Sequence, residues 1–411
     1  MLSLNWLTIL AIAFWQPVQL VKAGPNECGG GTYVQPTDGQ CEGRPLDAQV
    51  VPDVFTRVEG DLLHYDLDEI DFDYWVFEEG HELEDEVPET LPVPYFVRVF
   101  EFNRDQTSIS FRDMGQAARE IIDDNLSSAG AVLFRNLHLR IANGTDFQEF
   151  WNQVRVSEEK GNWTYYPYDG RIGNVRNQID GLDTTDSIDA DELLSMHSEM
   201  AYNPVPCSKI MFYGVQDAIG GDTVLVRNVD MAKMVPDNVK PFFEAHGGVR
   251  HKKFFVNNTT PLSQDDITFK GEKPELSWQW AAGTQDIEEA IEFFLDREYK
   301  REDIIIHDNG DMEVSFVHPG YLVHPETGED MWYNNQNHHS PCEMADGTKM
   351  PQEMIDELIL AQWKCAYGLH LEQGDWLILD NFQVMHGRTP YERIRPDLPR
   401  TLYVVYTKGT F

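Results

Sequence analysis

The chain has 411 residues, enough for one large domain with additions or two ordinary domains, and its hydrophobic share of 41% suffices for a sizeable core. Its 70 acidic and 32 basic residues give a formal net charge of -38 at pH 7. This charge argues against nucleic acid and anionic membranes as partners, because both carry the same sign of charge.

The first 23 residues have the pattern of a secretory signal peptide. Residues 2–15 are apolar but too few to span a bilayer, and Val21 and Ala23 are small residues at a cleavage position before Gly24. We therefore predict a signal peptide over 1–23 and no membrane span after its removal. A short anchored helix is the alternative interpretation. No later stretch is long and apolar enough to cross a membrane.

Four sequon regions agree with entry into the secretory pathway. They begin at Asn125, Asn143, Asn162 and the overlapping pair Asn257 and Asn258. Together with the signal pattern, they predict a glycoprotein that is secreted or resident in the ER lumen.

Five cysteines are present. Cys28 and Cys41 lie in a Gly/Pro-rich segment, and we predict that they form a disulfide in an oxidising compartment. Cys207, Cys342 and Cys365 leave an odd thiol. The absence of a Cys-x-x-Cys pair argues against a zinc ribbon or a thioredoxin-like site.

Residues 24–90 form an extension of unusual composition. Residues 24–52 are Gly/Pro-rich and predicted to be irregular, whereas 61–89 are dense in Asp and Glu and contain no Lys or Arg. Aromatic residues interrupt the acidic run and predict that it packs on the domain that follows: Tyr65, Phe72, Tyr74, Trp75 and Phe77. Calcium binding by the acidic run is an alternative interpretation, but no Asp-x-Asp-x-Asp-Gly loop occurs to support it.

From residue 91 to the C-terminus the pattern is that of helices and strands in one domain. Residues 114–126 have helical spacing, and the apolar run 130–135 predicts a buried strand. Residues 146–154 predict a helix with Thr145 as its N-cap and Gln148 completing a capping box.

Further strands and helices are predicted in the rest of the chain. Strands are predicted over 210–215, 371–379 and 401–406, and helices over 286–300, with Thr284 as a cap, and over 354–366. Periodicity alone therefore indicates an α+β fold but does not distinguish between the possible architectures.

The segment that carries chemistry is Met196-His197-Ser198-Glu199-Met200. Residues i and i+2 of a strand point to the same face, so His197 and Glu199 are expected to face the same way. His386 is the candidate for a third ligand, and two His with one carboxylate form the facial triad of non-haem Fe(II) oxygenases. The alternative for His197 alone is a structural histidine.

Other motifs follow this pair in a fixed order: Gly220-Gly221-Asp222-Thr223, Gly374-Asp375-Trp376, His386 and Arg400. In this order the chain resembles the taurine dioxygenase/clavaminate synthase-like family of Fe(II)- and 2-oxoglutarate-dependent oxygenases, from about residue 91 to the C-terminus. The resemblance implies a double-stranded β-helix, or jelly-roll, with flanking helices. It also implies that residues 227–365 form a long insert between core strands.

The resemblance implies the cofactors Fe(II) and 2-oxoglutarate, with His197, Glu199 and His386 as metal ligands. Arg400 matches the arginine that holds the distal carboxylate of 2-oxoglutarate, and Thr223 matches the hydroxyl that assists it. Arg393 and Arg395 are the alternatives to Arg400, with a solvated loop as their other interpretation. Gly220 and Gly221 would also make a turn into a strand without any ligand.

The resemblance also bears on the reaction. Family members that halogenate lack the metal carboxylate, so Glu199 disfavours halogenation. Glutamate at this position is typical of the clavaminate synthase branch, which favours an amino-acid-like small molecule as substrate.

Trp332-Tyr333-Asn334 resembles a segment near the active site, and Asn334 and Tyr202 are the candidates for substrate contacts. His338 and His339 are better explained as a solvated pair than as a second metal site.

The expected function is oxidation, most simply hydroxylation, of a small molecule by dioxygen, with release of succinate and CO2. The alternative is a secreted metal-binding jelly-roll glycoprotein without oxygenase activity.

Overall fold

The computed structural model describes residues 54–58, 63–64, 96–157, 160–166, 178–185, 190, 193–258, 276–325, 327–335, 343–394 and 399–408. Contacts divide the chain into two units, Met1–Pro45 and Leu46–Phe411, and everything described below lies in the second. Several predictions concern residues outside the described ranges: the signal peptide, the Cys28–Cys41 disulfide, the aromatic residues of the acidic run, His338, His339 and Arg395.

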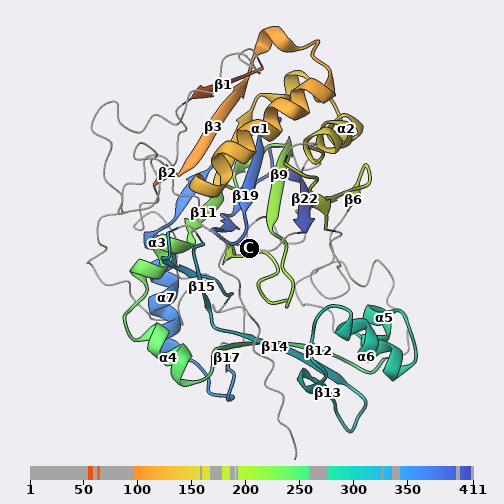
Figure 1. Cartoon of the computed structure of the whole chain (residues 1–411), viewed down its shortest axis with the longest axis vertical. Helices are drawn as coiled ribbons and strands as arrows, with labels where there is room; N and C mark the ends of the chain where they lie inside the picture. Colours follow the sequence, from red (N-terminus) through yellow and green to blue (C-terminus); the bar gives the residue numbers. More distant parts are fainter. Residues whose placement is uncertain are drawn as a thin grey trace, which may run out of the picture. The chain divides into compact units, whose positions relative to one another are not determined.

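One large sheet forms the first layer of the core (Figure 1). Its strands lie in the order β1 (Phe55–Val58), β3 (Val97–Phe102), β4 (Ala131–Arg135), β19 (Trp376–Asp380), β9 (Lys209–Gln216), β22 (Thr401–Lys408), β7 (Leu182–Thr184) and β6 (Gln178–Ile179), with β5 (Thr164–Tyr165) also paired to β22. β3 and β4 are parallel, and the other pairs of this sheet are antiparallel.

A smaller antiparallel sheet forms the second layer. Its order is β2 (Leu63–His64), β18 (Tyr367–Leu369), β11 (Thr223–Arg227), β20 (Val384–Arg388) and β8 (Leu194–His197). β10 (Ile219–Gly220) and β21 (Tyr391–Glu392) form a short ribbon beside it. The two layers make the jelly-roll that the resemblance implies, so the predicted fold class is confirmed.

The buried residues explain how the layers pack. Residues on alternate positions of β4 point to opposite faces of the sheet, so Ala131 and Leu133 enter the cluster between the two sheets, whereas Val132 and Phe134 enter the cluster beneath the helices. A strand covered on both faces must be apolar throughout, which is why 131–134 read as a continuous apolar run.

Two helices cover the outer face of the large sheet: α1 (Phe111–Ala129) and α2 (Gly144–Val154). The helical spacing around Ala118, Ile121 and Ile122 is confirmed, because all three are buried against this face. α1 ends at Gly130, whose φ of 78° is the left-handed conformation that glycine adopts without a steric cost.

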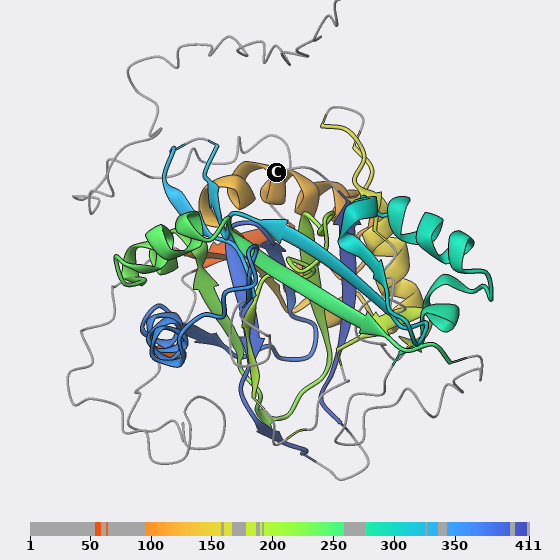
Figure 2. The ribbon, with the colours of Figure 1, turned by 90° about the horizontal axis from the view of Figure 1, so that it is seen from below.

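The insert between β11 and β18 builds its own substructure (Figure 2). It contains the helices α3 (Asn228–Met234), α4 (Val239–Ala245), α5 (Trp278–Ala282), α6 (Ile287–Leu295) and α7 (Gln352–Lys364), a sheet of β13 (Ile304–Ile306), β14 (Met312–His318), β12 (Val249–Phe255) and β17 (Glu343–Met344), and the hairpin β15 (Tyr321–Val323) with β16 (Asp330–Trp332). Residues of α3, α4 and α7 pack on the outer face of the small sheet, and α5 and α6 pack on the insert's sheet.

Five details of the predicted elements are wrong. Asn143, not Thr145, caps α2, because its Oδ1 accepts a hydrogen bond from the backbone N–H of Asp146 at 3.0 Å, and Gln148 instead donates to the carbonyl of Asp180. Asp286, not Thr284, caps α6, which ends at Leu295 rather than at 300. The predicted strand 371–379 begins only at Trp376.

The predicted extension contributes to the core sheet. Strand β1 lies within the range 24–90 and pairs along its whole length with β3, and Phe55 is buried against Phe102 and Phe134. Within the described residues, no helix combines the length and hydropathy needed to cross a bilayer.

A buried histidine pair joins two strands of the insert. The Nδ1 of His318 accepts a hydrogen bond from the backbone N–H of Gly320 at 3.0 Å, so its Nε2 carries the proton and donates to the Nε2 of His251 at 3.3 Å. Burial lowers the pKa of His318 to about 4 and the pKa of His251 well below its usual value.

We expect this pair to make the protein sensitive to acid. Both rings are neutral when folded but protonate near pH 6.5 when unfolded, so stability is fully present above that pH and falls as the pH drops toward 4. The loss from His318 alone is on the order of 3 kcal/mol. Urea unfolding of wild type and His318→Gln between pH 7.5 and 4.5 measures it: the variant should show the shallower decline, and equal slopes would contradict the prediction.

Candidate metal centre

The two predicted histidine ligands face each other across neighbouring strands. β8 and β20 are antiparallel, and His197 lies directly opposite His386 in their register. Side chains of such a cross-strand pair lie on the same face of the sheet, and the two ring centroids are 4.5 Å apart. Sheet pairing therefore brings together two residues that are distant in the sequence.

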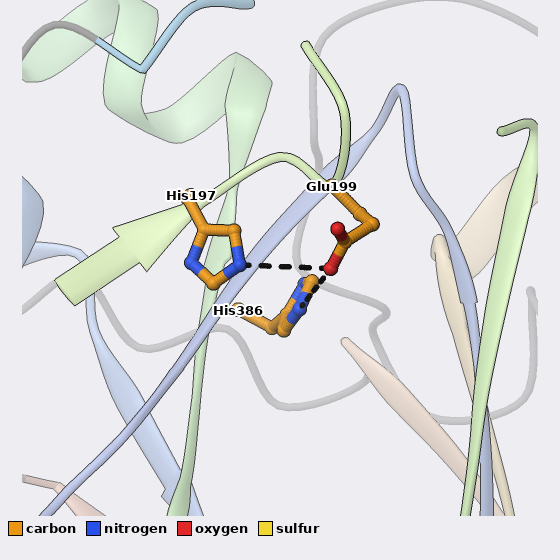
Figure 3. A group of neighbouring side chains, drawn as sticks. All are labelled: His197, Glu199 and His386. Carbon is orange, nitrogen blue, oxygen red and sulfur yellow. Dashed lines mark ion pairs between the residues drawn. The ribbon is translucent and has the colours of Figure 1, made fainter. Parts of the chain in front are cut away.

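Glu199 completes the group (Figure 3). Its Oε2 lies 3.8 Å from the Nε2 of His197 and 3.8 Å from the Nε2 of His386, and the three ligand atoms all lie within 4.8 Å of one another. The prediction that His197 and Glu199 face the same way is confirmed. However, β8 ends at His197, so Glu199 lies in the turn that follows the strand.

The surroundings favour a bound cation over three free side chains. The side chains of Glu199 and His386 are only 4% and 5% exposed, and that of His197 is 18% exposed, so the group opens on the His197 side. The Nδ1 of His197 donates to the carbonyl of Ser195 at 2.8 Å, which leaves the lone pair of Nε2 directed at Glu199. Phe212 packs against His386 with ring centroids 5.1 Å apart.

The predicted anchor for 2-oxoglutarate is assembled from both sheets. Arg400 immediately precedes β22 in the large sheet, and Thr223 opens β11 in the small sheet. Both are buried, and an Nη atom of Arg400 lies 3.3 Å from the hydroxyl of Thr223. Of the two alternatives to Arg400, Arg393 is exposed, which agrees with its interpretation as part of a solvated loop.

This anchor lies a short distance from the metal ligands. Leu225 is the cross-strand partner of His386 on β11, and Thr223 lies two residues along the same strand, so Thr223 and His386 are diagonal neighbours roughly 7–8 Å apart. A short extended diacid can span such a separation.

Gly221 allows the close approach of Arg400. Its φ is 71°, and a Cβ added there would lie 3.0 Å from the Cδ of Arg400 and 3.1 Å from its Nε. Gly221 thus has a packing role in addition to making a turn.

A second buried arginine was missed from the sequence. Arg388 follows His386 by two positions on β20, faces Thr223 across the ladder, and holds its guanidinium carbon 4.9 Å from the ring centroid of Tyr391. The alternation that predicts a common face for His197 and Glu199 applies equally to His386 and Arg388, so the signal was present.

Residues of the insert lie beside the group. Tyr333 packs in a buried cluster with Phe382 and with Ala201, which lies two residues after Glu199. Burial is the main reason that the pKa of Tyr333 is raised well above its usual value, and Cys207, Asp380 and Glu199 add smaller effects. This agrees with the predicted nearness of the segment 332–334. Asn334 is fully buried and donates to the carbonyl of Gly320, whereas Tyr202 is half-buried with the ammonium of Lys253 4.4 Å from its ring centroid. Their substrate contacts stay predictions.

Comparison with known proteins places the chain among dioxygenases. The family described as "Taurine catabolism dioxygenase TauD, TfdA family" matches residues 96–406, which is more than half of the chain. Dapdiamide synthesis protein DdaC of Enterobacter agglomerans is 25% identical over 295 residues, covering 66% of this chain and 81% of that protein. A clavaminate synthase-like protein of Arabidopsis thaliana is 21% identical over 290 residues, covering 67% and 82%. Among solved structures, AAD-2 in complex with Mn(II) and N-oxalylglycine is 14% identical with a TM-score of 0.44, covering 76% of this chain and 94% of that one.

Proposed function

Because the chain belongs to the TauD/TfdA family of dioxygenases, we propose that it is an Fe(II)- and 2-oxoglutarate-dependent oxygenase that hydroxylates a small, amino-acid-like molecule. The observation that carries this proposal is the convergence of His197, Glu199 and His386 beside the buried pair of Arg400 and Thr223.

The donor set suits the metal. Two neutral imidazole nitrogens and one carboxylate oxygen, with the remaining coordination positions open, are the ligands of non-haem Fe(II) oxygenases. The carboxylate of Glu199 is almost fully buried, and an ionised group in such a place needs a positive partner. A divalent cation held between the three ligand atoms provides that partner.

Each group in the site has a distinct task. Fe(II) and 2-oxoglutarate, when bound, supply the oxidising chemistry: dioxygen oxidises a substrate C–H bond while 2-oxoglutarate is decarboxylated to succinate and CO2. Arg400 offers two parallel N–H donors to the distal carboxylate, and the hydroxyl of Thr223 donates a third hydrogen bond. The apolar side chains between the two sheets keep bulk water away from this pair.

The substrate side is formed where the insert meets the core. The loop after Glu199 contains Tyr202, and Tyr202 contacts Lys253 of the insert. We assign Tyr202 and Asn334 as substrate-side residues, and Glu199 favours hydroxylation over halogenation because it occupies the position a halide would need. The alternative is a metal-binding glycoprotein without oxygenase activity. Metal binding alone does not explain why Arg400 and Thr223 are buried as a pair, so this alternative is not supported.

Release of succinate tests the proposal. The purified protein, supplied with Fe(II), 2-oxoglutarate and dioxygen, is screened against pools of amino acids and related small molecules. At least one pool should raise succinate formation well above the rate without substrate, and a product with one added oxygen should appear in it. The assignment would be refuted if succinate formation were the same with and without the protein, or the same with and without Fe(II).

We also propose that the protein enters the secretory pathway and carries N-glycans. Asn143, Asn162, Asn257 and Asn258 are exposed, which glycosylation requires, whereas Asn125 is half-buried and donates to the carbonyl of Ile121. We therefore expect glycans at the exposed sequons and little at Asn125. Glycopeptide mass spectrometry of the natural protein measures the occupancy of each site, and unmodified asparagine at all of them would contradict the proposal.

A further inference from the structure

The backbone between the first two predicted metal ligands leaves the sheet. β8 ends at His197, so Ser198 and Glu199 have no strand neighbours within the described residues. Their backbone groups nevertheless need partners, because both residues are buried and an unpaired N–H or C=O there is costly. Two asparagine side chains supply these partners, and neither belongs to β8 or its ladder.

Asn381 binds the backbone of Glu199. Its Oδ1 accepts from the N–H of Glu199 at 2.7 Å, and its Nδ2 donates to the carbonyl of Glu199 at 2.8 Å and to that of Cys207 at 2.9 Å. Asn381 lies in the turn between β19 and β20 and is fully buried. One amide side chain thus pairs with both backbone groups of one residue, as a neighbouring strand would.

Asn335 binds the backbone of Ser198 in the same way. Its Oδ1 accepts from the N–H of Ser198 at 3.0 Å, and its Nδ2 donates to the carbonyl of Ser198 at 3.0 Å. Asn335 belongs to the insert and lies 137 residues away in the sequence. The residue between the two metal ligands is therefore held by the insert, and the carboxylate ligand itself is held by the core.

An apolar contact joins the same three segments. Ala201, Tyr333 and Phe382 form a buried cluster, and the rings of Tyr333 and Phe382 have centroids 5.4 Å apart. These residues lie within two positions of Glu199, Asn335 and Asn381. The two asparagines and this cluster therefore form one unit that fixes the turn after His197.

Fixing this turn matters because the chain is not held there by sheet pairing. Met200 has a φ of 56°, the left-handed region, so the backbone reverses directly after the carboxylate ligand. A ligand on such a turn must be ordered before it binds metal, and any disorder in the free site weakens the affinity.

We propose that Asn381 and Asn335 are positioning residues that hold Glu199 and His197 in the metal-binding arrangement, and that Asn335 couples the insert to the metal. This inference rests on the proposed function, since it takes the three residues as metal ligands. Outer residues that orient metal ligands typically change metal affinity by about 10–100-fold when they are removed.

The test measures Mn(II) binding to the full-length protein by electron paramagnetic resonance of the free ion, without turnover. The variants are Asn381→Ala, Asn335→Ala and the control Gln279→Ala. Gln279 is also buried, lies in the insert on α5, and donates to Asn257 far from the two ligands in sequence. The thermal midpoint is recorded for each, so that a general loss of stability is seen separately.

We expect Mn(II) to bind at least about tenfold more weakly to Asn381→Ala and Asn335→Ala, and with wild-type affinity to Gln279→Ala even where its midpoint falls. Affinities within twofold of wild type for both asparagine variants would overturn the inference.

Two further outcomes are distinguishable. If wild type itself binds no Mn(II), the proposed metal site is refuted, and the positioning role of the two asparagines is refuted with it. If Asn381→Ala does not fold, Asn335→Ala decides the question, because Asn335 is half-buried and its truncation disturbs the core less than that of the fully buried Asn381.

Discussion

Replacing His386 by alanine is expected to lower substrate turnover by roughly 10³-fold or more, with the same result for His197→Ala and Glu199→Ala. A metal centre contributes several kcal/mol of transition-state stabilisation, and each 1.4 kcal/mol corresponds to about a tenfold change in rate. Within the part of the chain that the structure describes, His197, Glu199 and His386 are the one group of three such residues whose ligand atoms converge, all within 4.8 Å, so removing one leaves two ligands. Succinate release and Fe(II) content of the purified variants measure the effect.

The matched control is His246→Ala. His246 lies in the insert, is partly exposed, and pairs with Asp346 at 2.9 Å rather than with the metal ligands. It should keep wild-type activity and Fe(II) content. Full activity of His386→Ala would show that the triad is assigned wrongly, whereas equal losses in all four variants would point to a general effect of removing histidine or carboxylate side chains.

Replacing Arg400 should raise the Michaelis constant for 2-oxoglutarate by at least about tenfold. Arg400 and Thr223 are buried, so bulk water has little access to replace a lost partner of the distal carboxylate. Loss of a buried, charge-assisted contact costs roughly 2–5 kcal/mol. Arg400→Lys keeps the charge but offers a single point of attachment, so its effect should be smaller than that of Arg400→Ala.

Arg393→Ala is the control for this prediction, since Arg393 is exposed on the preceding loop. Succinate formation against 2-oxoglutarate concentration is measured for all variants, with Arg395→Ala included. If the Michaelis constant changed by less than about twofold in Arg400→Ala but rose sharply in Arg395→Ala, Arg395 rather than Arg400 would be the residue that binds the distal carboxylate.

Local signals were enough to predict most of the elements. The helix around Ala118 and Ile121 was predictable because its apolar residues repeat on one face, and β4 because a strand covered on both faces is apolar throughout. Asn143 and Thr145 are both good N-caps, so the choice between them depends on which residue adopts the extended backbone that precedes the helix.

The site was predictable from the order of its motifs rather than from periodicity. His197 and His386 meet because β8 pairs with β20, and that pairing has no local signal in either strand. The same holds for Asn335 and Asn381, whose side chains bind backbone groups 137 and 182 residues away. Such contacts are set by tertiary packing, which is why Asn335 and Asn381 were missed, whereas the order of the motifs pointed to His197, Glu199 and His386.

The central claim is that one metal ion and 2-oxoglutarate bind together beside Arg400. Anaerobic binding of 2-oxoglutarate to the full-length protein, measured with Fe(II) and again after chelation of the metal, tests it most directly. We predict one molecule bound per chain with Fe(II) present, and a large loss of affinity both after chelation and in Glu199→Ala. Binding of 2-oxoglutarate that is unchanged by removal of the metal, or no binding under either condition, would contradict the account.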